Sequence, residues 1–313
     1  MSMGHVVRVI RRCLPAALLV ALSPLAAPAA TIPVACPPGS LGTFTLQGFA
    51  PGDVLLVSGT CTVNLVIPAE ISGVTLDGQG TATIAAADST QATITIRGAS
   101  ITVKGFTITG GLAGISVTSS GTATIDGNVI QSSTLDGIDV IRGATATIIN
   151  NTVQNNTDFG IAVSEGANAR IGFVLSTDAT ASPNRIQNNP RGGIVVTRSS
   201  AARIVGNTIQ NNGNATTLAD GILVIEVSQA DISSNLINGN ARHGINVGNN
   251  SGVNLGRDTG TGILDAPNTT TTPNTLFGIN CFTNSYADGR LGSLNGTSGA
   301  KSFAGSCSDS LIP

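Results

Sequence analysis

Four aspartates and one histidine could do chemistry if the chain folds so that they meet. Asp136 and Asp139 lie three residues apart, Asp158 follows one repeated segment later, and Asp220 precedes His243 by 23 residues. Asp136, Asp220 and His243 each stand directly before a glycine at equivalent positions of the repeat. Neighbouring carboxyl groups can serve as acid and base, and several together can hold Ca²⁺, which prefers about six to eight oxygen ligands.

Two catalytic or metal-binding arrangements follow from these positions. Asp136 and Asp139 are candidates for acid–base catalysis, and with Asp158 they are candidates for a calcium site. Asp220 could orient His243 as a general base, because residues on adjacent coils of one column lie within hydrogen-bonding reach. The alternative for both arrangements is that these are solvated turn residues, since aspartate before glycine is common in turns.

The elements that would position these groups repeat along the chain. A glycine followed by an aliphatic residue begins a short apolar run at Gly114, Gly137, Gly160, Gly193, Gly221, Gly244 and, more loosely, Gly289. The first six are separated by 23, 23, 33, 28 and 23 residues, so a 23-residue unit recurs with short inserts. A fixed period of this size predicts a solenoid.

Short strands explain the pattern within each unit better than helices do. Runs such as Ala123-Thr-Ile-Asp and Gly137-Ile-Asp-Val alternate apolar and polar residues and are separated by Asn, Gly and Ser. Three such strands per unit predict an all-β, single-domain right-handed parallel β-helix of about 23 residues per coil. Neighbouring coils would then lie about 4.8 Å apart, with Ile and Val filling the interior.

Stacked coils turn each position of the unit into a column. The asparagines that begin Asn128-Val-Ile-Gln and Asn151-Thr-Val-Gln can hydrogen-bond to their copies above and below. The outward amide column that ends these segments could satisfy itself or bind sugar hydroxyls, and inserts near 173–183, 214–218 and 256–273 border it. The ligand-binding candidates on this face are Gln131, Gln154, Arg185, Gln187, Gln210 and Asn238.

A second outward column carries charges of alternating sign. Arg142, Glu165, Arg198 and Glu226 each stand five residues after a repeat glycine. Each charge would face opposite charges on the coils above and below, which predicts an ion-pair ladder that sets register and solubility. The alternative is a charged groove for an ionic ligand.

These segments resemble the right-handed parallel β-helix repeat family of bacterial exported proteins, in the pectate-lyase-like fold group. The resemblance covers about residues 50–285 and rests on Gly73-Val-Thr-Leu-Asp-Gly-Gln-Gly, the Asn-x-Ile-Gln-x-Asn units and the copies of Gly137-Ile-Asp-Val. It implies the fold strongly and function weakly, because members include polysaccharide lyases, hydrolases, epimerases and adhesins.

The sequence departs from the catalytic members of that group. It has only two lysines, Lys104 and Lys301, whereas the lyases resemble one another in a Lys or Arg base beside an acidic calcium cluster. Arg242-His243-Gly244 matches part of the Gly-His-Gly of polygalacturonase-type hydrolases, and adjacent Asp-Asp and epimerase-like Asp-Pro-His-Glu do not occur. The motifs by themselves therefore favour a non-catalytic protein.

Composition and the N-terminal segment indicate an exported protein. Charged residues make up 10% of the chain, the formal net charge is −2, and no basic stripe occurs, which argues against nucleic-acid binding. Arg8, Arg11 and Arg12 precede an apolar stretch, and Ala27-Pro28-Ala29 resembles a cleavage site, so residues 1–29 read as a signal peptide. We expect the mature protein in the periplasm, on the cell surface or outside the cell, with no transmembrane segment.

Four cysteines remain after this leader, and they form two terminal groups. Cys36 and Cys61 lie near the start, and Cys281 and Cys307 lie near the end. Three connectivities are formally possible, and only the pairing within each group closes local loops. Disulfides there would fasten a cap at about 31–61 and another at about 281–313, where a solenoid has no neighbouring coil.

Three functions remain open at this point. The first is a non-catalytic protein that binds a glycan or another envelope component through the outward Gln/Thr face. The second is a lyase or hydrolase that acts on a polysaccharide, acidic or neutral. The third is a structural or adhesive role, for which the solenoid itself suffices. The oligomeric state is not indicated by any feature of the sequence.

Overall fold

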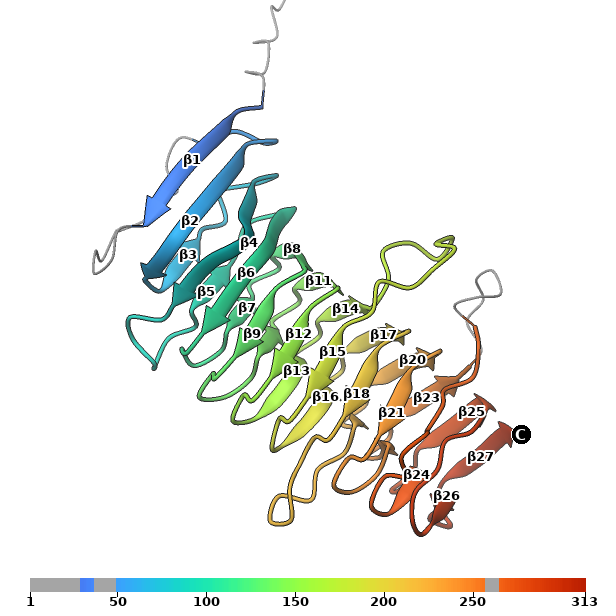
Figure 1. The fold of residues 1–313 in the computed structure, drawn as a ribbon. Helices are drawn as coiled ribbons and strands as arrows, with labels where there is room; N and C mark the ends of the chain where they lie inside the picture. The colour runs from blue at the N-terminus through green and yellow to red at the C-terminus, as the bar shows by residue number, and fades with distance from the viewer. Residues whose placement is uncertain (1–28, 37–48, 257–264) are drawn as a thin grey trace, which may run out of the picture.

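The protein is a stack of short parallel strands. The computed structural model describes residues 29–36, 49–256 and 265–313, which form 27 strands running from β1 at one end to β27 at the other (Figure 1). Every pairing between these strands is parallel. The all-β solenoid predicted from the repeats is therefore confirmed.

Each coil contributes strands to three faces, which we call the first, second and third sheets. The first sheet has ten strands. They are β3 (Leu65–Ile67), β5 (Ile94–Ile96), β7 (Ile115–Val117), β10 (Ile138–Val140), β13 (Phe159–Val163), β16 (Gly192–Val196), β19 (Ile222–Val224), β22 (Ile245–Val247), β24 (Phe277–Cys281) and β26 (Gly299–Phe303).

The second sheet follows the first along each coil. Its strands are β1 (Thr31–Cys36), β2 (Val54–Thr62), β4 (Thr75–Ala85), β6 (Ile101–Thr109), β8 (Thr122–Asp126), β11 (Thr145–Ile149), β14 (Asn168–Ile171), β17 (Ala201–Val205), β20 (Gln229–Ser233), β23 (Gly252–Leu255), β25 (Tyr286–Arg290) and β27 (Ser308–Ile312).

The third sheet completes the coil. Its strands are β9 (Val129–Gln131), β12 (Thr152–Gln154), β15 (Arg185–Gln187), β18 (Thr208–Gln210) and β21 (Leu236–Asn238). The long strands β2, β4 and β6 bend around the corner, so the second and third sheets are continuous at the N-terminal end.

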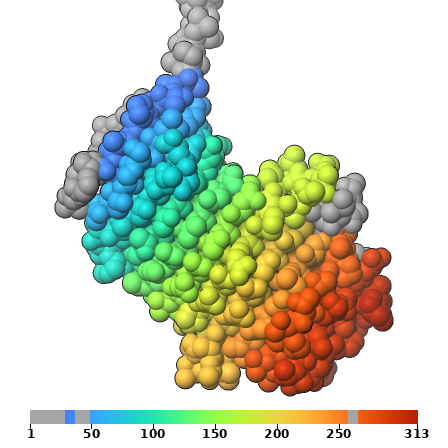
Figure 2. Space-filling view, in the orientation of Figure 1, coloured from blue at the N-terminus to red at the C-terminus, as the bar shows by residue number. Residues whose placement is uncertain are grey.

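The inserts leave the register of the coils unchanged. Ile138 pairs with Ile115 on one side and with Ile161 on the other, as the 23-residue period requires. Ile161 in turn pairs with Ile194 although 33 residues separate them, because the extra residues form a loop after β14. That yellow-green loop projects from the body of the solenoid (Figure 2). The inward Ile and Val side chains form one continuous buried core.

Two ladders of buried asparagines run along the stack at the corners of the third sheet. In the first ladder, Asn207 Nδ2 donates to Asn235 Oδ1 at 3.1 Å and to the Ile171 carbonyl at 2.9 Å. Asn207 Oδ1 accepts from the backbone N–H of Asn184 at 3.0 Å and from its Nδ2 at 2.9 Å. The first ladder comprises Asn128, Asn151, Asn184, Asn207, Asn235 and Asn268, and the second comprises Asn156, Asn189, Asn212, Asn240 and Asn274.

Both ends of the described stack carry a disulfide. Cys36 bonds to Cys61 and Cys281 bonds to Cys307, so the local pairing is confirmed. Residues 281–313, expected as a cap, contain β25, β26 and β27, which extend the stack by further parallel pairings. The predicted signal segment lies almost wholly outside the described residues. No helix in the described ranges is long and apolar enough to cross a membrane.

The asparagine ladder generates a first prediction. Asn207→Ala would leave the Asn184 backbone N–H without the side-chain oxygen that accepts from it, and would remove one donor from the Ile171 carbonyl. Because buried polar groups without hydrogen bonds are costly, we expect the free energy of unfolding to fall by about 2–4 kcal/mol.

Urea denaturation measures this loss, and Asn168→Ala is the matched control. Asn168 is exposed on β14, so its loss should change the free energy of unfolding by no more than about 0.5 kcal/mol. Equal effects of the two substitutions would contradict a structural role for the ladder.

Candidate active-site groove

The aspartates singled out in the sequence gather in one groove on the outer face of the first sheet. The groove has a volume of about 550 Å³. Arginines and an aromatic ring join the carboxylates in its lining. The lining includes Asp136, Asp139, Asp158, Phe159, Arg191, Asp220 and Arg242.

Strand alternation places Asp139 on this face. Ile138 and Val140 point into the core and are fully buried, so Asp139 between them points outward from β10. Across the sheet its partner on β13 is Ala162, and the next residue in that row is Val195 on β16. Asp139 therefore stands at one end of a small apolar floor.

Asp136 lies in the turn that leads into β10. Its Oδ1 accepts a hydrogen bond from the backbone N–H of Phe159 on the next coil at 3.0 Å. Burial raises the pKa of Asp136 to about 7, and repulsion from Asp139 and Asp158 adds to the rise. The Phe159 N–H and Arg191 oppose this shift.

The pKa of Asp139 is raised to about the same value as that of Asp136. Burial raises the pKa of Asp139 to about 7, with repulsion from Glu165 in the same direction and Arg142 opposing it. Two carboxyl groups that repel each other and titrate near neutrality hold fewer than two charges at pH 7. The pair can therefore offer both a proton donor and a proton acceptor.

Asp158 and Arg191 form the rim beside this pair. Arg191 Nε lies 3.4 Å from Asp158 Oδ1, an ion pair in which the arginine is largely exposed. Burial raises the pKa of Asp158, and the arginine charge opposes the rise.

Asp220 is buried, and protein donors occupy its carboxylate. Arg242 donates to it from Nε at 2.8 Å and again from Nη2, and Asn246 Nδ2 donates at 2.9 Å. The backbone N–H of His243 completes the set at 3.2 Å. Sequence analysis expected Asp220 to orient the imidazole. The structure places the two residues side by side but joins Asp220 to the backbone of His243, so the carboxylate positions Arg242.

The His243 ring is not among the groups that line the groove. It is 7% exposed and stacks on Phe277, with ring centroids 5.9 Å apart. Burial lowers the pKa of His243, which keeps the imidazole neutral at pH 7. Its Nδ1 has no hydrogen-bond partner among the described residues. A role as base stays a prediction that this position does not favour.

The carboxylates do not form a ready cation site. Within the described ranges, no three His, Cys, Asp or Glu side chains come close enough together to hold a metal ion. Asp136, Asp139 and Asp158 line one groove without sharing a coordination sphere. Calcium binding stays a prediction.

Phe159 is a site residue that sequence analysis missed. It stands in the column of Asp136 and Asp220, one position before a repeat glycine, and lines the groove. Its ring lies against Gly192 of the next coil, where an added Cβ would come within 2.7 Å of the ring. Only 3% of the residues are aromatic, and Phe159 stands in the same column as a glycine, Gly192. This rare aromatic residue beside a glycine could have indicated a site residue.

The wall after the first sheet is the predicted ladder of charges. Glu165 lies 3.4 Å from Arg142 and 3.6 Å from Arg198, and Arg198 lies 3.7 Å from Glu226. The alternating ion pairs expected from the sequence are confirmed. Since these side chains are exposed, each pair contributes about 0–1 kcal/mol to stability, and a role of the ladder in setting the register stays a prediction.

The outward amide column on the third sheet satisfies itself. Gln154 donates to Gln131 at 3.1 Å, Gln187 donates to Gln154 at 2.9 Å, and Gln210 donates to Gln187 at 3.1 Å. Arg185 Nε donates to Gln187 Oε1 at 2.6 Å. These groups bind one another along the stack, and their role as ligand-binding residues stays a prediction.

The last member of this column is covered by an insert. Asn238 donates to Thr271 Oγ1 at 2.9 Å, and its Oδ1 accepts from the Thr271 backbone N–H at 2.9 Å. The side chain is consequently only 8% exposed. Thr271 therefore closes this end of the amide face.

Comparison with known proteins identifies the family. The family described as right handed beta helix region matches residues 92–259 and, in a second match, residues 172–285. The chain belongs to this family, and the right-handed parallel β-helix predicted from its repeats is confirmed. A search of curated proteins finds no significant match.

Two solved structures show the same fold. Pectate lyase Pel9A is similar with a TM-score of 0.56 and 16% identity, over 89% of this chain and 79% of that one. The periplasmic alginate epimerase AlgG is similar with a TM-score of 0.53 and 18% identity, over 83% of this chain and 61% of that one. At such identities the likeness establishes the fold alone, so the reaction has to be inferred from the residues of the groove.

The raised carboxyl pKa values predict how stability depends on pH. The folded protein keeps a proton on Asp136 up to about pH 7, whereas the unfolded chain releases it near the ordinary value of 3.8. Stability should therefore fall as pH rises between these values. Asp136→Asn carries no charge at any pH and should raise the free energy of unfolding at pH 8 by about 1–3 kcal/mol.

Urea denaturation at about pH 3 and about pH 8 tests the sign. At the lower pH both proteins are uncharged at this position, so their stabilities should be close. A variant that is less stable than the parent at pH 8 would show that the carboxylate is stabilised in the groove.

Proposed function

We propose that the protein is a polysaccharide-acting enzyme whose active site is the groove on the first sheet. The observation that carries this proposal is the pair Asp136 and Asp139, two carboxyl groups in one groove with pKa values of about 7. Half-buried acids that repel each other destabilise a fold near neutral pH, and such pairs are typical of catalytic sites.

The pair is suited to acid–base chemistry at a glycosidic bond. One carboxyl retains its proton near pH 7 and can protonate the leaving oxygen, while the ionised partner accepts a proton. If the accepted proton comes from water, the reaction is hydrolysis. If it comes from a sugar carbon, the reaction is elimination, and a double bond forms in the product.

The remaining groove residues support a sugar polymer as substrate. Phe159 offers an apolar ring face against which a sugar ring can pack. Arg191 and Arg242 also lie along the groove, where each is paired with a carboxylate, Asp158 and Asp220 respectively. The structural neighbours are named as a pectate lyase and an alginate epimerase, which agrees with a polysaccharide substrate.

The non-catalytic alternative, glycan or envelope binding through the Gln/Thr face, has less support. The amide groups of Gln154 and Gln187 already bind within their own ladder, so a ligand would have to break these bonds. The structural or adhesive alternative needs no site at all and does not account for two half-buried acids with raised pKa values. We also propose that the protein is exported, because the disulfides Cys36–Cys61 and Cys281–Cys307 persist in oxidising compartments.

An assay for new reducing ends tests the enzymatic proposal. The protein should release reducing ends from at least one polymer in a panel that includes pectate, alginate and neutral glucans. Asp136→Asn and Asp139→Asn should each lower the rate by about 100-fold or more, since removal of a general acid or base costs that much. Ultraviolet absorbance of an unsaturated product distinguishes elimination from hydrolysis.

The pH profile and a control variant make this test specific. The rate should pass through a maximum near pH 7, because both carboxyls are protonated well below that pH and both are ionised well above it. Gln154→Ala, on the third sheet, should leave the rate unchanged. No release from any polymer, or full activity in both aspartate variants, would reject the proposal.

A further inference from the structure

The charges of the groove on the first sheet restrict the polymers that it can accept. Among the described residues, six carboxyl groups and three guanidinium groups line it. They belong to Asp136, Asp139, Asp158, Glu165, Asp220 and Glu226, and to Arg191, Arg198 and Arg242. We propose that the groove binds an uncharged polysaccharide and hydrolyses it, an inference that rests on the proposed enzymatic function.

The arginines at the rim of the groove already have carboxylate partners. Arg191 Nε lies 3.4 Å from Asp158 Oδ1. Arg242 donates from Nε to Asp220 Oδ1 at 2.8 Å, and the Asp220 carboxylate is buried. An acidic sugar would have to displace a carboxylate of the protein to reach either guanidinium group. Their positive charge is therefore not available to a polyanion.

The balance of charge in the lining is negative. Arg198 lies 3.6 Å from Glu165 and 3.7 Å from Glu226, so one guanidinium group faces two carboxylates. Even with Asp136 and Asp139 both protonated, four other acidic side chains line the described groove beside three arginines. A groove lined by one sign of charge repels polymers of that sign along its length. An uncharged chain meets no such barrier.

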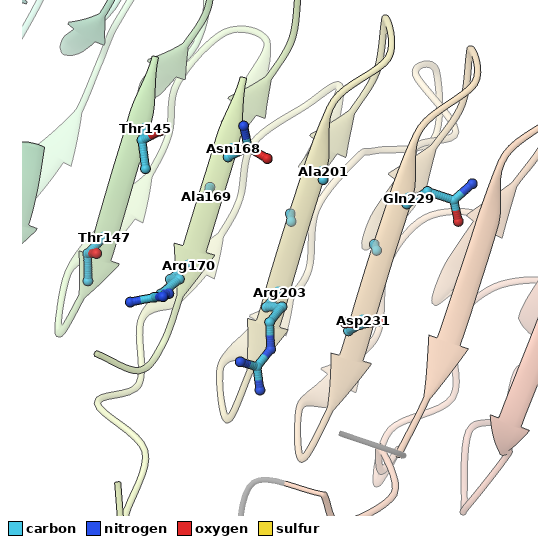
Figure 3. A pocket seen from close by; sticks show the side chains of 11 residues that line it. Thr145, Thr147, Asn168, Ala169, Arg170, Ala201, Arg203, Gln229 and Asp231 are labelled. Carbon is cyan, nitrogen blue, oxygen red and sulfur yellow. The ribbon is translucent and has the colours of Figure 1, made fainter. Parts of the chain in front are cut away.

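Arginines on the second sheet are also engaged within the solenoid. Arg203 on β17 and Asp231 on β20 are register partners, and Figure 3 shows them on neighbouring strands. Arg170 Nη1 donates to the Val174 carbonyl at 3.0 Å. On both faces, these guanidinium groups are occupied by partners from the protein itself.

The floor of the groove is apolar beside the acid pair. Ala162 on β13, Val195 on β16 and Leu223 on β19 continue the outward row of Asp139 in register. The residues on either side of each are fully buried, so strand alternation points these three outward. Aliphatic side chains have no hydrogen-bond donor, and a carboxylate held over them would lose water without gaining a partner. The C–H face of an uncharged sugar ring packs there without that cost.

An exposed leucine extends this apolar surface from the loop after β18. Leu218 lines the groove, and 53% of its surface is exposed. The preceding residue fastens the loop, because Thr217 Oγ1 donates to the Pro190 carbonyl at 2.6 Å. Asn214 Oδ1 accepts from the Thr217 backbone N–H at 3.0 Å. The loop thus holds a further apolar contact at the groove.

An uncharged substrate decides between the two reactions open to the acid pair. Elimination removes a proton from the ring carbon beside a carboxylate, and a cation has to stabilise the negative charge that develops there. A neutral sugar has no carboxylate to activate that proton, so hydrolysis remains. In its direct form, the ionised carboxyl takes a proton from water, and the water oxygen bonds to the anomeric carbon. The glycosidic C–O bond breaks, and the leaving oxygen takes the proton of the other carboxyl.

Reducing-end assays on polymers that differ only in charge test the proposal. The protein is incubated with amylose, laminarin, dextran and galactomannan, and with pectate and alginate in the presence and absence of Ca²⁺. We expect reducing ends from a neutral polymer, without the ultraviolet absorbance of an unsaturated product. Carboxymethylation of that polymer should lower the rate by about tenfold or more at about 10 mM ionic strength, and about 0.5 M NaCl should reduce this difference.

Two matched variants connect the selection to the groove. Glu226→Gln removes one negative charge from the lining and should raise the ratio of the carboxymethyl-polymer rate to the neutral-polymer rate by about threefold at low salt. Glu70→Gln makes the same change at an exposed position outside the groove and should leave this ratio unchanged. Equal effects of the two variants would show that the selection does not arise in the groove.

The outcomes distinguish this inference from the enzymatic proposal. Preferred cleavage of pectate or alginate, with or without Ca²⁺, would overturn the neutral substrate and leave the enzymatic proposal standing. An unsaturated product, or equal low-salt rates on the neutral polymer and its carboxymethyl derivative, would do the same. No release of reducing ends from any of the polymers would reject both.

Discussion

The alignment of each coil on the next is the constraint from which the other features follow. Buried asparagines such as Asn184 and Asn207 connect neighbouring coils through both their side-chain amides and the backbone. A slip by one residue would break these bonds and also turn the isoleucine columns outward. The described insert after β14 therefore leaves the coil as a loop and does not disturb the register of the strands.

That alignment also explains why acids can be held close to one another. Asp136 and Asp139 lie on a coil whose backbone is already fixed by its neighbours, so neither side chain can move far to escape repulsion. Their raised pKa values mean that the two acids lower the stability of the fold near neutral pH. Polar groups that destabilise a fold in this way are expected at functional sites. Asp220 shows the contrasting case, in which Arg242 and backbone N–H groups satisfy a buried carboxylate.

The sequence predicted the features that depend on period alone. The repeat glycines placed the strands, the alternation in Gly137-Ile-Asp-Val placed Asp139 outward, and local cysteine pairs indicated the disulfides. Side-chain orientation across coils was not predictable in this way. The column of residues before the repeat glycines contains both Asp220 and Phe159. The Asp220 carboxylate contacts the His243 backbone, whereas the Phe159 ring packs against Gly192. The contact of Arg203 with the Phe173 ring depends on how the loop after β14 folds, which no repeat encodes.

The central claim is that coil stacking holds Asp136 and Asp139 in one groove, where their pKa values are raised to about 7. Carbon-13 NMR of the side-chain carboxyl groups, recorded as pH is raised, measures this directly. The account predicts that both resonances titrate near pH 7 and that the charge of Asp139 raises the pKa of Asp136. Titration of both groups near the ordinary value of 3.8 would show that the groove leaves them solvated, and the proposed acid–base pair would have no physical basis.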